Sequence, residues 1–93
     1  MTSTKAVDTA LAILKTLPVG SFCGVSNGKK YLVSRSLFAK GASEKLVARE
    51  LGGTDYISAN VYHLTSGARL YPCEMSAEKV LDFIADLRDV SAQ

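Results

Sequence analysis

The sequence predicts a small α+β fold with two layers, in which helices cover one face of a four-stranded, mostly antiparallel sheet. Three observations lead to this prediction. An Asn-Gly pair lies between two strand-like runs, an alternating run precedes a Ser-Gly pair, and apolar residues recur at helical spacing near both ends of the chain. The predicted order is α-β-β-α-β-β-α from two hairpins, and residues 1–93 are expected to form a single small α+β domain.

Turn and stop signals divide the chain into its predicted elements. These are a helix over residues 5–17, strands over 20–26 and 29–35, a helix over 44–51, strands over 56–64 and 69–74, and a last helix after residue 76. Pro18 ends the first helix, because proline cannot continue the hydrogen-bonded backbone. Asn27 and Gly28 tolerate the positive φ of a two-residue turn, so we expect Phe22 opposite Val33.

The middle of the chain is predicted to form a short helix and a second hairpin. Ser43 is a suitable N-cap for this helix, and the Gly52-Gly53 pair is a suitable end. The run that follows alternates from residue to residue, which is typical of a half-buried strand. A two-residue turn would then place Tyr62 opposite Tyr71.

The last helix has the clearest signals. Ser76 can cap its N-terminus. Its apolar residues form one stripe: Val80, Leu81, Phe83, Ile84 and Leu87. Together with the first helix, it is expected to cover one face of the sheet.

The charge of the chain is unevenly distributed. Residues 1–46 hold seven basic and two acidic side chains, whereas residues 47–93 hold four basic and seven acidic ones. A local basic cluster can attract anions although the net charge is only +2. No apolar run approaches the ~20 residues that span a bilayer, and the N-terminus lacks a secretory pattern. We therefore expect a cytoplasmic protein without membrane contact, and with reduced cysteines.

Few side chains offer catalytic chemistry. His63 shares its predicted strand face with apolar residues, so it is expected to be partly buried. No His, Cys and carboxylate group has the spacing of a metal site, and no cofactor is expected. Cys23 and Cys73 are catalytic candidates only if the protein is a redox enzyme. A reactive thiolate needs exposure and a positive neighbour, and Cys23 is predicted to lie near Lys30.

A family resemblance bears on the redox reading. It is carried by four segments: Leu17-Pro-Val-Gly, Lys29-Lys-Tyr-Leu-Val-Ser-Arg, Glu50-Leu-Gly-Gly-Thr-Asp-Tyr-Ile-Ser and Arg69-Leu-Tyr-Pro-Cys-Glu-Met. The chain resembles a family of short bacterial proteins, some of which are named peptide methionine sulfoxide reductase. The resemblance implies a bacterial cytoplasm and, for members so named, thiol chemistry. Reductases of the A type use a Gly-Cys-Phe-Trp motif, where this chain has Ser21 in place of the cysteine.

Basic and aromatic residues suggest binding instead of catalysis. Lysines attract phosphates, and exposed aromatic rings stack on unpaired bases. An uncovered sheet face with tyrosines would equally suit a protein partner or a homodimer. The candidate binding residues are Lys29, Lys30, Tyr31, Arg35, Tyr62 and Tyr71.

The sequence thus favours a small soluble binding module over an enzyme, acting through protein contact or self-association. Two alternatives stay open. One is nucleic-acid binding through the basic hairpin, whose cations are interleaved with aromatic residues. The other is a thiol-based redox enzyme of the peptide methionine sulfoxide reductase type.

Overall fold

The computed structural model describes residues 4–91, and within them it contains two α-helices, six strands and one 3-10 turn. The elements follow one another along the chain with short connections. They are α1 (Thr4–Lys15), β1 (Gly20–Ser26), β2 (Lys29–Phe38), η1 (Ala39–Gly41), β3 (Ser43–Glu50), β4 (Tyr56–Leu64), β5 (Gly67–Pro72), α2 (Ala77–Ala85) and β6 (Arg88–Asp89). No helix in this part of the chain is both long enough and apolar enough to cross a membrane.

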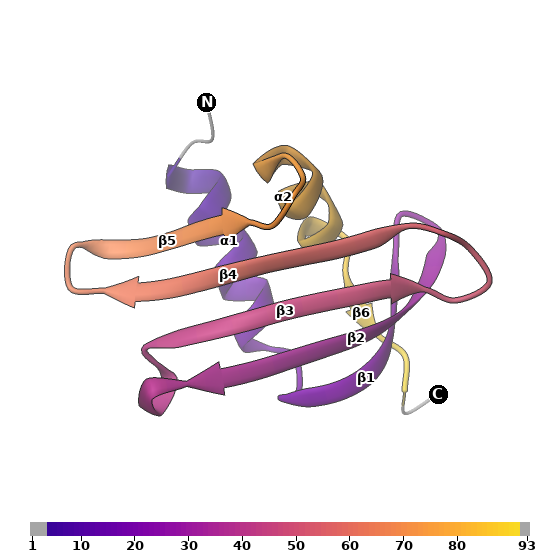
Figure 1. The fold of residues 1–93 in the computed structure, drawn as a ribbon, viewed down its shortest axis with the longest axis horizontal. Coiled ribbons are helices and arrows are strands. Elements are labelled where there is room, and N and C mark those ends of the chain that lie inside the picture. The colour runs from indigo at the N-terminus through magenta and orange to yellow at the C-terminus, as the bar shows by residue number, and fades with distance from the viewer. Residues whose placement is uncertain (1–3, 92–93) are drawn as a thin grey trace.

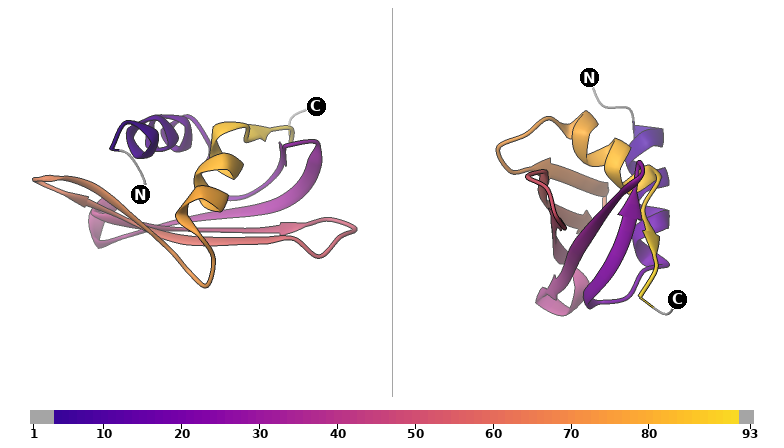
Figure 2. Two further views of the ribbon diagram at one scale, coloured as in Figure 1. Left: turned by 90° about the horizontal axis from the view of Figure 1, so that it is seen from above. Right: turned by 90° about the vertical axis from the view of Figure 1, so that its right-hand side faces the viewer.

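The strands form one antiparallel sheet in the order β5-β4-β3-β2-β1-β6. Both helices lie on the same side of this sheet, so its other face is uncovered (Figures 1 and 2). The fold remains α+β, but the prediction of a four-stranded sheet with three helices was wrong. The sheet gains β3 at its centre and the short β6 at one edge.

The largest correction concerns residues 44–51, which were predicted to be helical but belong mostly to strand β3. Leu46 and Ala48 are completely buried and alternate with exposed or half-buried residues, as a strand with one covered face requires. Their neighbours β2 and β4 supply hydrogen bonds on both sides. Residues with a good helix propensity adopt a strand here because pairing and burial outweigh local preference.

The first hairpin confirms its predicted register, whereas the second does not. Phe22 pairs with Val33 around the Asn27-Gly28 turn, as expected. In the second hairpin Leu64 pairs with Gly67, so Tyr62 lies opposite Arg69 and not opposite Tyr71. The turn residues are therefore 65 and 66, one position earlier than predicted, and each residue pairs two positions earlier along β5.

The core lies between the helices and the covered face of the sheet. Ser76 is the N-cap of helix α2, and its hydroxyl accepts a hydrogen bond from the Lys79 backbone N–H at 3.2 Å, as the sequence predicts. Phe83 meets the edge of the Tyr31 ring with centroids 4.8 Å apart. The predicted stripe of α2 is buried throughout: Val80, Leu81, Phe83, Ile84 and Leu87.

The chain after α2 closes the free edge of β1. Strand β6 pairs with Gly24 and Val25, and the Val90 N–H donates to the Cys23 carbonyl at 2.9 Å. A side chain at Gly24 would come within 2.9 Å of a methyl carbon of Leu87, so this close approach requires glycine. Strand β5 forms the opposite edge of the sheet.

Candidate functional site

The uncovered face of the sheet is the most extensive candidate surface of the described chain, and we call it the open face. Side chains alternate along a strand, and residues paired across antiparallel strands share a face. The open face therefore holds every second residue of each strand, starting from Ser21 in β1, Lys30 in β2, Ser43 in β3, Tyr56 in β4 and Arg69 in β5.

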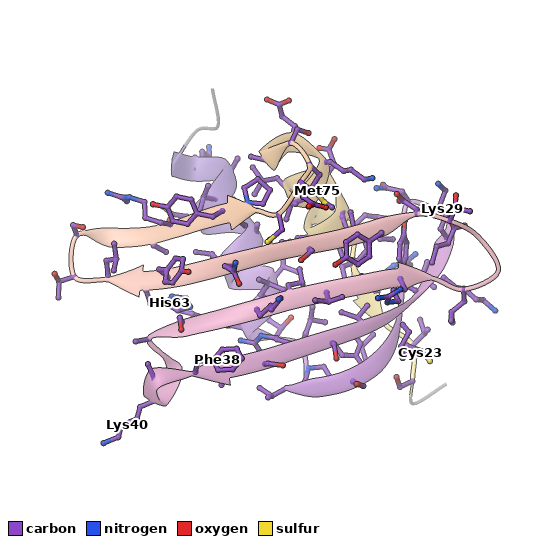
Figure 3. The ribbon with its side chains drawn as sticks, in the orientation of Figure 1. Cys23, Lys29, Phe38, Lys40, His63 and Met75 are labelled. Carbon is purple, nitrogen blue, oxygen red and sulfur yellow. The ribbon has the colours of Figure 1, made fainter. Side chains whose placement is uncertain are left out.

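Aromatic rings project from one end of the open face. Phe38 ends β2 and is 53% exposed, while Tyr62 and Tyr71 are 41% and 54% exposed. The Tyr62 and Tyr71 rings meet edge to face, with centroids 5.6 Å apart and an angle of 64° between the planes. Figure 3 shows Phe38 at the end of the sheet opposite to Cys23. Several large apolar side chains exposed close together on one surface often mark a binding site.

Cations are spread over the same face. They are Lys30, Lys45, Arg49, Arg69 and Arg88, all of them exposed. Among the described strand residues of the open face, none is acidic. The Arg49 guanidinium carbon lies 5.5 Å from the centre of the Tyr56 ring, a cation–π contact. Sequence reasoning did not single out Arg69 and Arg88, whose place on this face follows only from strand register.

The predicted binding residues are split between the two faces of the sheet. Lys30, Tyr62 and Tyr71 lie on the open face. Lys29 is exposed at the β1–β2 turn, but it pairs with the buried Ser26 on the covered side, at the end of the sheet away from Phe38 (Figure 3). Two others lie on the covered face, where Tyr31 is 3% and Arg35 7% exposed: these residues are core components. The alternation of β2 separates Tyr31 from Lys30 although they are adjacent in sequence.

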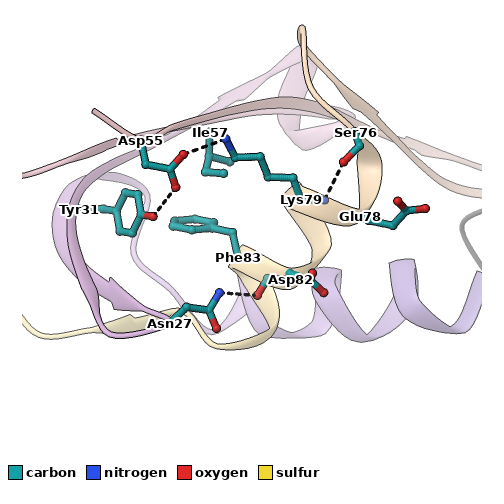
Figure 4. A pocket seen from close by; sticks show the side chains of 9 residues that line it. All are labelled: Asn27, Tyr31, Asp55, Ile57, Ser76, Glu78, Lys79, Asp82 and Phe83. Carbon is teal, nitrogen blue, oxygen red and sulfur yellow. Dashed lines mark hydrogen bonds and ion pairs between the residues drawn. The ribbon is translucent and has the colours of Figure 1, made fainter. Parts of the chain in front are cut away.

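Tyr31 belongs to a polar network at the start of α2 (Figure 4). Its hydroxyl donates to Asp55 Oδ2 at 2.7 Å, and Lys79 Nζ lies 2.8 Å from Asp55 Oδ1. Hydrogen bonds from Lys79 and Tyr31 lower the pKa of Asp55 to about 2. Burial and the Asp55 carboxylate raise the pKa of the Tyr31 hydroxyl well above its usual range.

These residues line a pocket of about 410 Å³ between the β3–β4 connection and α2. Phe83 and Ile57 form its apolar part, and Asp55 and Lys79 neutralise each other at its mouth. An ionised carboxylate already paired with an ammonium group is a poor general base at neutral pH. The network therefore links the start of α2 to the sheet through Asp55, which contacts both Tyr31 and Lys79.

A second polar cluster lies on the covered face near the end of α1. Arg35 Nε donates to Glu44 Oε1 at 2.9 Å, and Arg35 Nη1 donates to the Leu17 carbonyl at 2.9 Å. His63 Nε2 lies 3.1 Å from Glu44 Oε2. Burial alone would raise the pKa of Glu44, but hydrogen bonds from Arg35 and His63 outweigh it and hold this pKa below its ordinary value.

This cluster borders a cavity of about 360 Å³. His63 is partly buried, as predicted, and it is held by the Glu44 carboxylate. A carboxylate that orients a histidine is one part of a catalytic triad. The side chains that line the cavity include no hydroxyl or thiol that this histidine could activate.

The two cysteines lie far apart. Cys23 is in β1, and Cys73 follows β5, with its backbone N–H donating to the Ser58 carbonyl of β4. Three strands separate β1 from β5, which corresponds to about 19 Å at the usual strand spacing. A disulfide requires Cα atoms within about 7 Å, so the two thiols cannot act as a pair within one chain.

Metal binding and known relatives give no further indication of function. Within residues 4–91, no three His, Cys, Asp or Glu side chains are grouped so that they could hold a metal ion. Comparisons with protein-family models, with curated proteins and with solved structures found no match for this chain.

Proposed function

We propose that the protein is a non-enzymatic binding module whose open face binds a polyanionic partner. The single observation that supports this most strongly is the charge of that face, where five exposed cations stand among the strands without an acidic neighbour on the same side. Charges of one sign on a flat surface add to a potential that attracts oppositely charged ligands. The near-neutral total charge of the chain conceals this local excess.

The acidic side chains of the C-terminal half lie elsewhere. Glu78, Asp82 and Asp86 belong to α2 and its end, on the covered side of the sheet. Among the strand residues, Glu50 and Asp89 pair in register with the buried Tyr31 and Gly24, so they belong to the covered face. Glu44, also on the covered face, is paired with Arg35, and Asp55 is paired with Lys79.

This charge pattern disfavours self-association through the open face. A twofold dimer brings the same patch of each copy together. Two open faces in contact would place ten cations in one interface with no carboxylate between them, and like charges brought together at an interface cost several kcal/mol. A partner that carries many negative charges avoids this repulsion and is attracted by the same cations.

Elution from a heparin column tests the proposal, because heparin is a polyanion without bases or aromatic groups. The unmodified protein should be retained and should elute only with added salt, since salt screens exposed charges. Lys45→Gln/Arg49→Gln removes two cations from the open face and should elute at clearly lower salt. The matched control Lys5→Gln/Lys15→Gln removes two exposed cations from α1 and should elute near the unmodified protein.

Two results would count against this function. One is a protein that passes through the heparin column at low salt. The other is an equal loss of retention in both double variants, which would mean that net charge matters and the open face does not. Circular dichroism of each variant shows whether it has kept its fold, and all four substituted side chains are exposed.

A further inference from the structure

We infer that the polyanion is a single-stranded nucleic acid, whose bases stack on the rings of Phe38, Tyr62 and Tyr71. This inference rests on the proposed function and adds the chemical class of the partner. Phosphates would pair with the cations of the open face, and the exposed π-faces would receive the bases.

The spacing of two of these rings suits a base. Phe38 pairs with Ser43 across β2 and β3, and Ser43 pairs with Tyr62 across β3 and β4. Phe38 and Tyr62 therefore stand two strand spacings apart, about 10 Å at the backbone, with only the small side chain of Ser43 between them. A base held between two rings needs roughly 7 Å, twice the rise between stacked bases. Long side chains on strands stand nearly perpendicular to the sheet, so these rings can flank a base.

Tyr71 supplies a further stacking surface beside the first. Its ring centroid lies 5.6 Å from that of Tyr62, and it is more than half exposed on the edge strand β5. The edge position leaves one side of the Tyr71 ring without a neighbouring strand. A second base can therefore approach this ring from the sheet edge.

Two cations lie next to the rings on the same face. Arg69 lies directly opposite Tyr62, and Lys45 lies two residues from Ser43 on the same face. Phosphates that follow the stacked bases would meet these two side chains. A duplex would offer its phosphates but not its base faces, which are already stacked, so an unpaired strand is the form that uses both groups.

The distribution of the rings argues against an acidic protein as the partner. Protein interfaces bury a contiguous apolar centre inside a polar rim. On the open face Tyr62 and Tyr71 meet edge to face, but Ser43 lies between Phe38 and Tyr62. Next to Tyr71 across the sheet lie the polar Asn60 and then Lys45. Alternating rings and polar or charged groups are the arrangement that single-stranded nucleic acid binding uses.

Fluorescence anisotropy with matched probes tests the inference. The probes are fluorescein-labelled 15-mers of deoxythymidine and of uridine, a 15-mer of abasic deoxyribose phosphate with the same charge, and a 15-base-pair duplex. We expect the single strands to bind at least about tenfold more tightly than the abasic chain. The deoxythymidine and uridine probes together show whether the sugar affects binding.

Ring substitutions locate the stacking surface. Tyr62→Leu/Tyr71→Leu keeps apolar bulk but removes both rings, and it should weaken binding of the single strands by about tenfold or more while leaving the abasic chain unaffected. Val19→Ala/Leu51→Ala is the control, because it removes two exposed apolar side chains that lie outside the strands of the open face. It should change binding by less than threefold.

The outcomes separate the inference from the function on which it rests. Equal binding of the abasic chain and the single strands would overturn base stacking and leave polyanion binding intact, and tighter binding of the duplex would do the same. Tighter binding of a poly-glutamate chain than of either single strand would identify an acidic protein as the partner. Failure of every polyanion to bind would overturn both proposals.

Discussion

Arg35 and Glu44 form a buried ion pair between the neighbouring strands β2 and β3, with Arg35 Nε 2.9 Å from Glu44 Oε1. The Glu44 side chain is only 4% exposed. The same arginine also donates to the Leu17 carbonyl, at the point where the chain leaves α1. One guanidinium group therefore ties two strands and the end of a helix together.

Glu44→Gln should destabilise the protein by about 3 kcal/mol, because Arg35 would keep its buried charge without a counter-ion. Urea unfolding followed by circular dichroism measures this change. Arg35→Met/Glu44→Leu removes both charges and should cost less than Glu44→Gln alone. If the double variant is the less stable of the two, the pair contributes more than charge compensation, and this explanation is wrong.

The contact between Asp55 and Lys79 predicts a pH dependence of stability. The pKa of Asp55 is about 2 in the folded protein, below its usual value of 3.8, so its contribution is complete above about pH 4 and is lost as the pH falls toward 2. Asp55→Asn should remove about 1–2 kcal/mol at pH 7, an amount reduced by the partial exposure of Lys79.

The same variant should give a flatter pH profile of stability between pH 4 and pH 2 than the unmodified protein. Urea unfolding at a series of pH values measures both profiles. An Asp55→Asn profile as steep as that of the unmodified protein would show that another carboxylate causes the loss of stability in acid.

The separation of Cys23 and Cys73 predicts their behaviour under oxidation. A mild oxidant should produce no intrachain disulfide, because about four strand spacings lie between the two residues. Non-reducing electrophoresis and mass spectrometry after limited digestion will show whether such a bond forms. We expect two free thiols in the monomer and the same stability with and without a reductant. A peptide cross-linked between these residues in the monomer would contradict the sheet order.

Local signals in the sequence were sufficient to predict the first hairpin, β1–β2, and helix α2. The Asn27-Gly28 turn fixes the first hairpin and its register because few other residues adopt its backbone angles. Ser76 and the apolar stripe of α2 likewise act within a few residues of one another. Such features need no knowledge of the rest of the chain.

Strand β3 could not be recognised in this way. Leu46 and Ala48 mark its buried face, but the third buried side chain is Glu44, whose charge hides the alternation. Arg35 is likewise a charged residue on the covered face of β2. Its charge led to the prediction that it lies at the surface and binds a partner. Only the pairing of the two strands shows that each charge neutralises the other.

The open face was equally difficult to foresee. Lys45 and Arg49 were expected on a helix, so their place beside the tyrosines on one surface depends on β3 being a strand. The predicted register placed Arg69 opposite Leu64, two positions from its true partner Tyr62 but on the same face. Aromatic candidates were easier, because alternation along β4 already placed Tyr62 on a face distinct from Val61.

Binding of a polyanion through the cations of the open face must weaken as salt is added, so the salt dependence of binding is the decisive measurement. Anisotropy with the labelled deoxythymidine 15-mer gives the association constant at several salt concentrations. If all five cations contact phosphates, the logarithm of this constant should fall with the logarithm of salt concentration with a slope of about −3.5. Lys45→Gln/Arg49→Gln should reduce the slope to about −2. A slope near zero, or one that this double variant leaves unchanged, would contradict the account.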